Sequence, residues 1–267
     1  MQRIKTLSEY FKKYELSEKD PESFWSEIAD SFTWKKKWDK VLDWDFEKAN
    51  TKWFQNAKLN ITENIFERNL KERGSKTAII WEPNDPSEPS IHLTYQELYE
   101  ETCKFSNALR LKGIKKGDRV IIYMPMVPEA AIAMLACARV GAVHSVVFAG
   151  FSSTSLADRI NDCQAKMVLT SDGNFRGNKT IPVKSVVDEA LEKSSTIESV
   201  IVLERTKQTI NMFEGRDHWW HDCIKVESNI CEAEVLDSED MLFILYTSGS
   251  TGKPKKLKIK KMSSLFF

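Results

Sequence analysis

Residues 118–150 read DRVIIYMPMVPEAAIAMLACARVGAVHSVVFAG and carry the clearest structural signal in the chain. Residues 118–124 form an apolar run of strand length. Residues 129–140 have the length and composition of a helix that stops at Gly141, because glycine readily adopts the left-handed conformation at a helix end. A second apolar run, 145–148, follows at once. A strand, a helix and a second strand in this order predict two parallel strands joined by a crossover helix.

The same alternation continues on both sides of this unit. Upstream, Thr94 and Glu97 form a capping box in front of a helical pattern that runs to Leu109. Downstream we expect a helix at 153–164, a strand at 166–170, a helix at 183–191 and a strand at 199–203. The strands are almost continuously apolar, which is typical of parallel strands buried on both faces. The sequence therefore predicts an α/β fold with a parallel sheet flanked by helices.

The charge balance limits the classes of partner. The 267 residues include 39 Lys and Arg and 39 Asp and Glu, so the formal net charge is zero. This balance argues against a protein that coats nucleic acid or anionic membranes. The most apolar stretch, 126–150, contains charged residues and a proline, and the N-terminus lacks the apolar core of a signal peptide. We expect a cytoplasmic protein with neither a nucleic-acid nor a membrane partner.

Cysteine and histidine do not indicate a metal site. The five cysteines are widely spaced, so reduced thiols are favoured over disulfides or zinc ligands. His218, His221 and Asp222 resemble an incomplete ligand set, and we expect this aromatic segment to pack against the protein instead.

Residues 1–60 are unusually rich in tryptophan. The indoles stand among charged residues at Trp25, Trp34, Trp38, Trp44 and Trp53. Pro21 in front of an amphipathic pattern indicates the start of a helix. Aromatic and basic residues together could stack on single-stranded nucleic acid. The acids are as dense as the bases, however, so we favour a helical segment that packs its indoles onto a larger domain.

A second apolar run leads into a loop of glycines, hydroxyls and lysines. Residues 241–246 are MLFILY, and residues 247–255 are TSGSTGKPK. Glycine lets backbone N–H groups approach an anion, hydroxyls donate hydrogen bonds and lysine adds positive charge. We therefore expect phosphate binding by Thr247, Ser248, Gly249, Ser250, Thr251, Gly252 and Lys253. The loop is not a Walker A motif, because a threonine replaces its first glycine and Pro254 its metal-binding hydroxyl. A flexible linker would not need two lysines beside a buried strand.

The segment YTSGSTGKPK, residues 246–255, resembles the signature loop of the adenylate-forming superfamily. Residues 121–151 are very similar to the corresponding part of AMP-forming acetyl-CoA synthetases, and so are Trp53-Phe54 and residues 59–68, LNITENIFER. The resemblance runs from about residue 8 to Lys255. It implies the N-terminal portion of the adenylate-forming fold. The expected parts are an acetyl-CoA synthetase-type segment at 1–60, the first part of an AMP-binding domain at 61–255 and a divergent basic tail at 256–267.

The resemblance also implies an activity, that of an acetate–CoA ligase using ATP with Mg²⁺ and coenzyme A. Acetate would attack the α-phosphorus of ATP to give acetyl-adenylate and pyrophosphate, and the thiolate of CoA would then take the acetyl group and release AMP. The loop at 247–253 would hold the β- and γ-phosphates. The basic turn of Arg176, Gly177, Asn178 and Lys179 matches the family's contact to the nucleotide end of CoA. Propionate in place of acetate stays an alternative.

The sequence departs from the family after Lys255, where residues 256–267 read KLKIKKMSSLFF. The family's acyl pocket, catalytic residues and C-terminal domain have no counterpart here. We therefore expect a truncated chain that is inactive alone and poorly soluble, with an unpaired sheet edge beside the strand at 241–246. Two other interpretations stay open. One is a non-catalytic remnant that binds nucleotide or CoA, or half of a split enzyme with a separately encoded C-terminal half. The other, less favoured, is a phosphate-loop NTPase.

Overall fold

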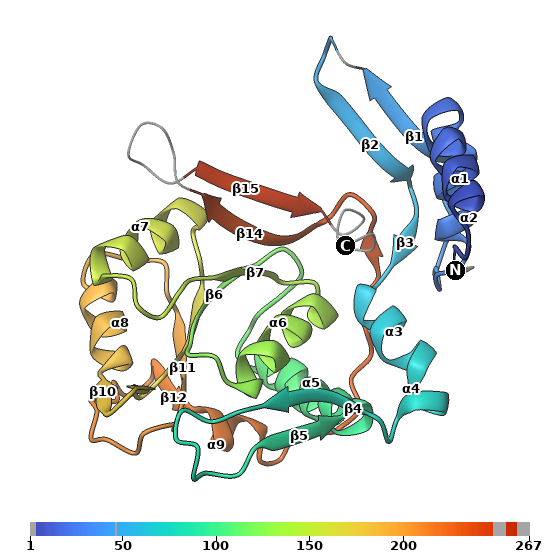
Figure 1. Cartoon of the computed structure of the whole chain (residues 1–267). Coiled ribbons are helices and arrows are strands. Elements are labelled where there is room, and N and C mark those ends of the chain that lie inside the picture. The colour runs from blue at the N-terminus through green and yellow to red at the C-terminus, as the bar shows by residue number, and fades with distance from the viewer. Residues whose placement is uncertain (1–3, 46, 248–254, 261–267) are drawn as a thin grey trace.

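A seven-stranded sheet forms the centre of the computed structural model, which describes residues 4–45, 47–247 and 255–260 (Figure 1). The strand order is β12-β11-β8-β6-β7-β14-β15. All neighbouring strands are parallel except β14 and β15, which are antiparallel. In chain order the strands are β6 (Arg119–Tyr123), β7 (Val143–Val146), β8 (Met167–Ser171), β11 (Ser199–Leu203), β12 (Asp217–Trp219), β14 (Met241–Thr247) and β15 (Lys255–Lys260).

Helices cover both faces of this sheet, as the apolar strands predicted. On β6, Val120 and Ile122 belong to one buried cluster, while Ile121 and Tyr123 belong to another. The first cluster lies under α5 (Tyr95–Leu111), α6 (Pro128–Val140) and α9 (Trp220–Ile224). The second lies under α7 (Ser153–Cys163) and α8 (Val183–Leu191). Side chains that alternate along a strand therefore enter two separate cores.

The local signals place the element boundaries well. The hydroxyl of Thr94 accepts a hydrogen bond from the Glu97 N–H at 3.2 Å, and the Glu97 carboxylate accepts one from the Thr94 N–H at 2.8 Å, so the predicted capping box is present. Helix α6 ends at Gly141, whose φ is 77°. Strand β7 begins at Val143, two residues before the expected start, because its N–H already donates to the Asp118 carbonyl.

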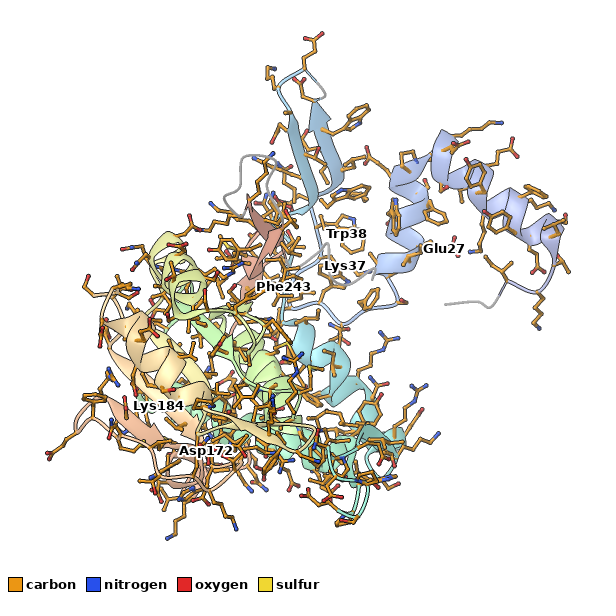
Figure 2. The ribbon with its side chains drawn as sticks, turned by 60° about the vertical axis from the view of Figure 1, so that its left-hand side comes forward. Glu27, Lys37, Trp38, Asp172, Lys184 and Phe243 are labelled. Carbon is orange, nitrogen blue, oxygen red and sulfur yellow. The ribbon has the colours of Figure 1, made fainter. Side chains whose placement is uncertain are left out.

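A buried lysine joins α8 to the edge strand β12. The Lys184 ammonium lies 2.7 Å from a carboxylate oxygen of Asp217 and 2.7 Å from one of Asp188. Arg216 contacts the same two carboxylates. Figure 2 labels Lys184 within this densely packed part of the chain. Each buried charge thus has partners of opposite sign, which offsets its loss of hydration.

The N-terminal segment is only half helical. Helices α1 (Leu7–Lys19) and α2 (Pro21–Ala29) confirm the helical expectation, and Pro21 stands at the first position of α2. Residues that follow form an unexpected antiparallel hairpin of β1 (Lys40–Asp45) and β2 (Asn50–Gln55). Figure 1 shows this hairpin extending away from the central sheet, with α1 and α2 beside it.

The tryptophans pack mainly on one another and on Phe54, whereas we expected them to pack onto a larger domain. Phe54 is fully buried, and its ring centroid lies 4.9 Å from that of Trp38 and 5.7 Å from that of Trp34. Trp25 and Trp53 complete the cluster. Trp44 is 63% exposed on the hairpin. The segment therefore has a small core of its own, because its indoles are close enough in sequence to meet locally.

Backbone pairing and one buried asparagine attach this segment to the rest. Strand β3 (Lys58–Leu59) pairs with β13 (Leu236–Asp237). Asn60 is 1% exposed and donates to the carbonyls of Ala138, Arg139 and Glu234 at 3.2, 3.1 and 2.9 Å. The chain then forms α3 (Ile61–Ile65), α4 (Glu67–Arg73) and the hairpin of β4 (Thr77–Trp81) and β5 (Ile91–Thr94).

The expectation of an unpaired edge at β14 is wrong. Residues 255–260 form β15, which pairs with β14 from Met241 to Thr247. Leu257 lies opposite Leu245, and Ile259 lies opposite Phe243. Lysines alternate with apolar residues in KKLKIK, which is a strand pattern of period two. The first part of the basic tail therefore extends the sheet by one strand.

Candidate functional site

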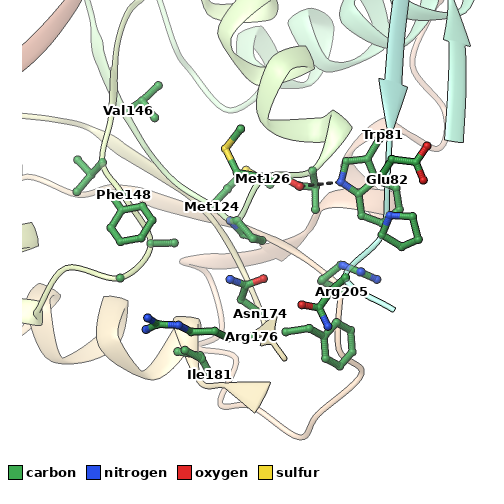
Figure 3. Close-up of a pocket in the computed structure, with 18 of the residues that line it drawn as sticks. Trp81, Glu82, Met124, Met126, Val146, Phe148, Asn174, Arg176, Ile181 and Arg205 are labelled. Carbon is green, nitrogen blue, oxygen red and sulfur yellow. Dashed lines mark hydrogen bonds between the residues drawn. The ribbon is translucent and has the colours of Figure 1, made fainter. Parts of the chain in front are cut away.

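A pocket of about 690 Å³ opens at the carboxyl ends of the parallel strands (Figure 3). Segments that follow β6, β7, β8 and β11 reach it, and so do residues near the ends of β4 and β14. Ligands of parallel α/β sheets bind at this edge, because the loops that leave the strands meet there. The lining includes Trp81, Asn84, Met124, Met126, Phe148, Asn174, Phe175, Arg176, Arg205 and Leu245.

Apolar side chains line much of the pocket and stay accessible. Phe148 and Met126 are 69% and 90% exposed. The Trp81 indole N–H donates to the Met126 carbonyl at 2.7 Å, and Figure 3 shows this bond at one end of the pocket with Phe148 at the other. Exposed apolar side chains beside a few polar groups are typical of a surface that receives a ligand.

Arg205 brings a fixed positive charge to the pocket. Its guanidinium lies 5.1 Å from the ring centroid of Trp81 and 4.9 Å from that of Phe175, so it is held between two aromatic faces. The fully buried Asp172 accepts the Arg205 backbone N–H at 2.8 Å and so fixes the turn that carries the residue. Glu88 lies 3.9 Å from the guanidinium. Desolvation raises the pKa of the nearby Glu129 carboxyl, against the opposing effect of Arg205.

The predicted CoA contacts form the tip of a small hairpin. Strands β9 (Asn174–Arg176) and β10 (Lys179–Ile181) pair antiparallel, with Arg176 directly opposite Lys179. Gly177 occupies the turn with a φ of 57°. Both cations are exposed, and within the described ranges neither forms an ion pair with a carboxylate. Opposed like charges destabilise a hairpin, so this arrangement would be relieved by an anion bound between them.

The predicted phosphate loop lies mostly outside the described residues. Ser248, Gly249, Ser250, Thr251, Gly252 and Lys253 all belong to the stretch 248–254 that the structure does not describe. Its flanks are placed: Thr247 ends β14 and pairs directly with Lys255 at the start of β15. The stretch therefore joins two hydrogen-bonded strands at the same sheet edge as the pocket, which Leu245 helps to line.

The end of the β14–β15 pair that adjoins the stretch 248–254 contacts α7. The Tyr246 hydroxyl donates to the Asp162 carboxylate at 2.6 Å, and the Lys256 ammonium lies 3.1 Å from the same carboxylate. The hydrogen bond from Tyr246 is the main cause that lowers the pKa of Asp162. Burial raises the pKa of Tyr246. The strand residues next to both ends of the stretch 248–254 are therefore held against α7.

The aromatic segment around Trp220 and the cysteines are part of the packing of the protein. Trp220 is 4% exposed and stacks on Phe105 with ring centroids 3.6 Å apart, so the aromatic segment packs as expected. All five cysteines are unpaired, and burial raises the pKa of Cys137 to about 12. Within the part of the chain that the structure describes, no three His, Cys, Asp or Glu side chains are arranged to hold a metal ion. No helix in that part is long and apolar enough to cross a bilayer.

Sequence reasoning missed several residues of the pocket. Trp81, Asn84 and Arg205 come from segments without a ligand motif, and only the proline-rich turn after Trp81 gave a local signal. Their relation to Arg176 depends on contacts between distant parts of the chain, which a local pattern does not show.

Comparisons with known proteins identify the family of the chain. The family model described as AMP-binding enzyme matches residues 66–261, and the model described as acetyl-coenzyme A synthetase N-terminus matches residues 10–65. The chain belongs to the AMP-binding enzyme family. The first match continues six residues beyond Lys255, into β15 and one residue past it.

Relatives within this family give the same picture. An acetyl-coenzyme A synthetase of Bdellovibrio bacteriovorus is 51% identical over 249 residues, which cover 93% of this chain and 39% of that protein. One of Syntrophobacter fumaroxidans is 53% identical over 92% of this chain and 38% of its own length. These confirm the resemblance to acetyl-CoA synthetases. The chain thus spans about two fifths of the length of these relatives.

A solved structure supports the fold. Acetoacetyl-CoA synthetase from Streptomyces lividans superimposes with a TM-score of 0.83 at 24% identity, over 92% of this chain and 37% of that one. The expected N-terminal portion of the adenylate-forming architecture is therefore confirmed.

Proposed function

We propose that this chain forms the part of a cytoplasmic acetate–CoA ligase that binds the ATP phosphates and CoA. Identity of 51% to an acetyl-coenzyme A synthetase over 93% of the chain supports the reaction class. The observation that carries the proposal is that the start of the predicted phosphate loop and the basic β9–β10 hairpin lie at the same edge of the sheet. Thr247, the first residue of the predicted loop, ends β14 there, and Arg176 lines the pocket from the β9–β10 hairpin.

The loop would act on MgATP as substrate. Backbone N–H groups and hydroxyls of 247–252 would hold the β- and γ-phosphates, and the Lys253 ammonium would balance their charge. As acetate attacks the α-phosphorus, negative charge grows on the departing pyrophosphate. Donors that are already oriented stabilise this charge without reorganisation. The product of the first step would be acetyl-adenylate.

The hairpin would act on CoA. Arg176 and Lys179 stand opposite one another at its tip, and a phosphate group between them would replace repulsion with two charge-assisted hydrogen bonds. The apolar lining beside Arg176, with Phe148 and Met124, would receive the less polar parts of the cofactor. CoA held there would deliver its thiolate to the acetyl-adenylate in the second step and release AMP.

The chain's share in this reaction is binding. It spans about two fifths of the length of the relatives, so we propose that the remaining groups of the ligase reaction come from a further segment, in the same polypeptide or in a separately encoded half. The acid is acetate in this proposal, with propionate as the alternative.

The test is direct binding of CoA and ATP to the full chain, measured by titration calorimetry. Arg176→Ala and Lys179→Ala should each weaken CoA binding by about 10-fold or more, because each removes a charge-assisted contact. Lys253→Ala should weaken ATP binding and leave CoA binding unchanged. Lys71→Ala removes an exposed lysine of α4 and serves as the matched control.

Two results would contradict the proposal. Wild-type affinity for CoA in both hairpin variants would remove the CoA clamp, and wild-type affinity for ATP in Lys253→Ala would remove the phosphate role of that lysine. Acetate-dependent exchange of pyrophosphate into ATP should be absent with this chain alone. Measurable exchange would show that the chain carries the whole first step.

A further inference from the structure

We infer that Asn84 is a positioning residue that holds the β9–β10 hairpin in the orientation that binds CoA. The inference rests on the proposed CoA clamp. The Asn84 amide nitrogen donates to the Gly177 carbonyl at 3.1 Å, and the Gly177 N–H donates to the Asn84 amide oxygen at 3.2 Å. One side chain thus binds both polar groups of the residue at the hairpin turn, 93 positions away in sequence.

The hairpin needs such support. It consists of three residue pairs in a two-stranded sheet of its own. Isolated two-stranded hairpins are marginally stable in water. The opposed charges of Arg176 and Lys179 weaken it further. A contact at Gly177, between the two cations, therefore decides how they are held in the unliganded protein.

The loop that carries Asn84 is itself well fixed. It joins β4 to β5 and contains Pro83, Pro86 and Pro89, whose rings restrict the backbone. Within the loop the Asp85 carboxylate accepts hydrogen bonds from the Ser87 N–H and hydroxyl at 2.9 and 2.8 Å. The restricted loop backbone therefore gives Asn84 a defined position from which to bind the hairpin.

A second contact joins the same two elements. Arg205 lies between Trp81, at the end of β4, and Phe175, on β9. This stack holds the hairpin at Phe175, in the middle of its three residue pairs, while Asn84 holds the turn at Gly177. The amide group of Asn84 is neutral, so it fixes the turn without neutralising either cation. Positioning of this kind raises affinity by reducing the ordering that binding would otherwise require.

The experiment is a double-mutant cycle on CoA binding, measured by calorimetry with the full chain. Asn84→Ala should weaken CoA binding about 5- to 10-fold in the wild-type background. In a background that carries both Arg176→Ala and Lys179→Ala the same change should alter affinity less than about 2-fold, because Asn84 acts through these two side chains. Asn107→Ala is the control, since this half-buried asparagine also donates to two backbone carbonyls, of Ser228 and Ile230, away from the pocket.

A second readout needs no ligand. The Gly177 amide should exchange its hydrogen faster in Asn84→Ala than in the wild type, while amides of β6 keep their protection. Asn84→Asp keeps the acceptor for the Gly177 N–H, so it should restore slow exchange of that amide.

Each outcome decides a specific point. Effects of Asn84→Ala that add to those of the combined Arg176→Ala and Lys179→Ala changes, or wild-type CoA affinity in Asn84→Ala, overturn the positioning role and leave the clamp standing. No CoA binding by the wild-type chain overturns the clamp and the positioning role together, even if the Gly177 amide is protected. Loss of CoA affinity with unchanged Gly177 exchange also overturns the inference, because the tether would then not order the turn.

Discussion

Replacement of Asn60 by alanine tests how the N-terminal segment is joined to the AMP-binding part. Asn60 lies near the end of the match to the acetyl-coenzyme A synthetase N-terminus, six residues before the AMP-binding match begins, and is buried to 1% exposure. Its amide nitrogen donates to three carbonyls, and its oxygen accepts from the Thr62 N–H at 3.0 Å and the Thr62 hydroxyl at 2.8 Å. Alanine removes all five contacts and leaves the fold otherwise unchanged.

These contacts determine how much stability Asn60→Ala should lose. Asn60 caps α3, and loss of a helix N-cap costs about 1 kcal/mol. The carbonyls of Ala138 and Arg139 each keep a backbone N–H partner, so they contribute little. The half-buried Glu234 carbonyl loses its hydrogen bond from Asn60, which costs about 1–2 kcal/mol. Asn60→Ala should therefore lower the free energy of unfolding by about 2–3 kcal/mol.

Urea unfolding, followed by tryptophan fluorescence and circular dichroism, measures this loss. The transition midpoint should fall with an unchanged slope. Asn60→Asp should be at least as unstable, although it is closer in shape, because a carboxylate would face the three carbonyl oxygens. Asn161→Ala, which removes one exposed bond to the Lys193 carbonyl, should change stability by less than about 1 kcal/mol. Wild-type stability in Asn60→Asp would refute the assigned contacts.

Three further perturbations address the interior. Phe54→Ala opens a cavity among the indoles and should cost about 3–5 kcal/mol in urea unfolding, whereas Trp44→Ala on the exposed hairpin should cost under about 1 kcal/mol. Lys184→Met leaves the buried Asp217 without its closest lysine and should cost about 3 kcal/mol or more at neutral pH. Burial tends to raise the pKa of Asp217, but Arg216 and Lys184 outweigh it and lower the pKa. The stabilisation from Asp217 is therefore present above the ordinary carboxyl pKa and is lost as the pH falls through the lowered value. Acid titration of Lys184→Met should show a smaller loss of stability than that of the wild type. Burial lowers the pKa of His144 to about 4, so the wild type should lose about 3 kcal/mol as pH falls from about 6.5 to about 4, and His144→Gln should lose less over that range.

Local patterns were sufficient for strands β6, β7, β8, β11 and β14 and for helices α5 to α8, but not for the two edge strands β12 and β15 or for α9. The helix at 183–191 and the strand at 199–203 have the predicted bounds, because apolar periodicity and burial coincide there. The β1–β2 hairpin had no such signal. Its turn contains Ala49 at a φ of 48°. Glycine or asparagine, which favour this conformation, would have indicated a turn in the sequence, but alanine does not. Phe54 also has a positive φ, which the packing around its ring maintains against the usual preference.

Some residues of the candidate site could be predicted from the sequence and others could not. The basic turn at 176–179 was recognisable because all its residues are adjacent in sequence. Asn84 and Arg205 were not, because their roles depend on Gly177 and on the rings of Trp81 and Phe175, which lie 30 to 124 residues away. No pattern within one segment reports such contacts.

Strand β15 also affects how copies of the chain meet. Within the described ranges it is the last strand of the sheet, so its outer backbone N–H and carbonyl groups have no strand partner there, and such an edge is a template for pairing with another chain. Its lysines at 255, 256, 258 and 260 act as gatekeepers, because a second copy aligned on this strand would bring like charges together. Salt screens such repulsion. Self-association of the chain through β15 should therefore increase with ionic strength, and replacing Lys258 by threonine should allow it at lower salt.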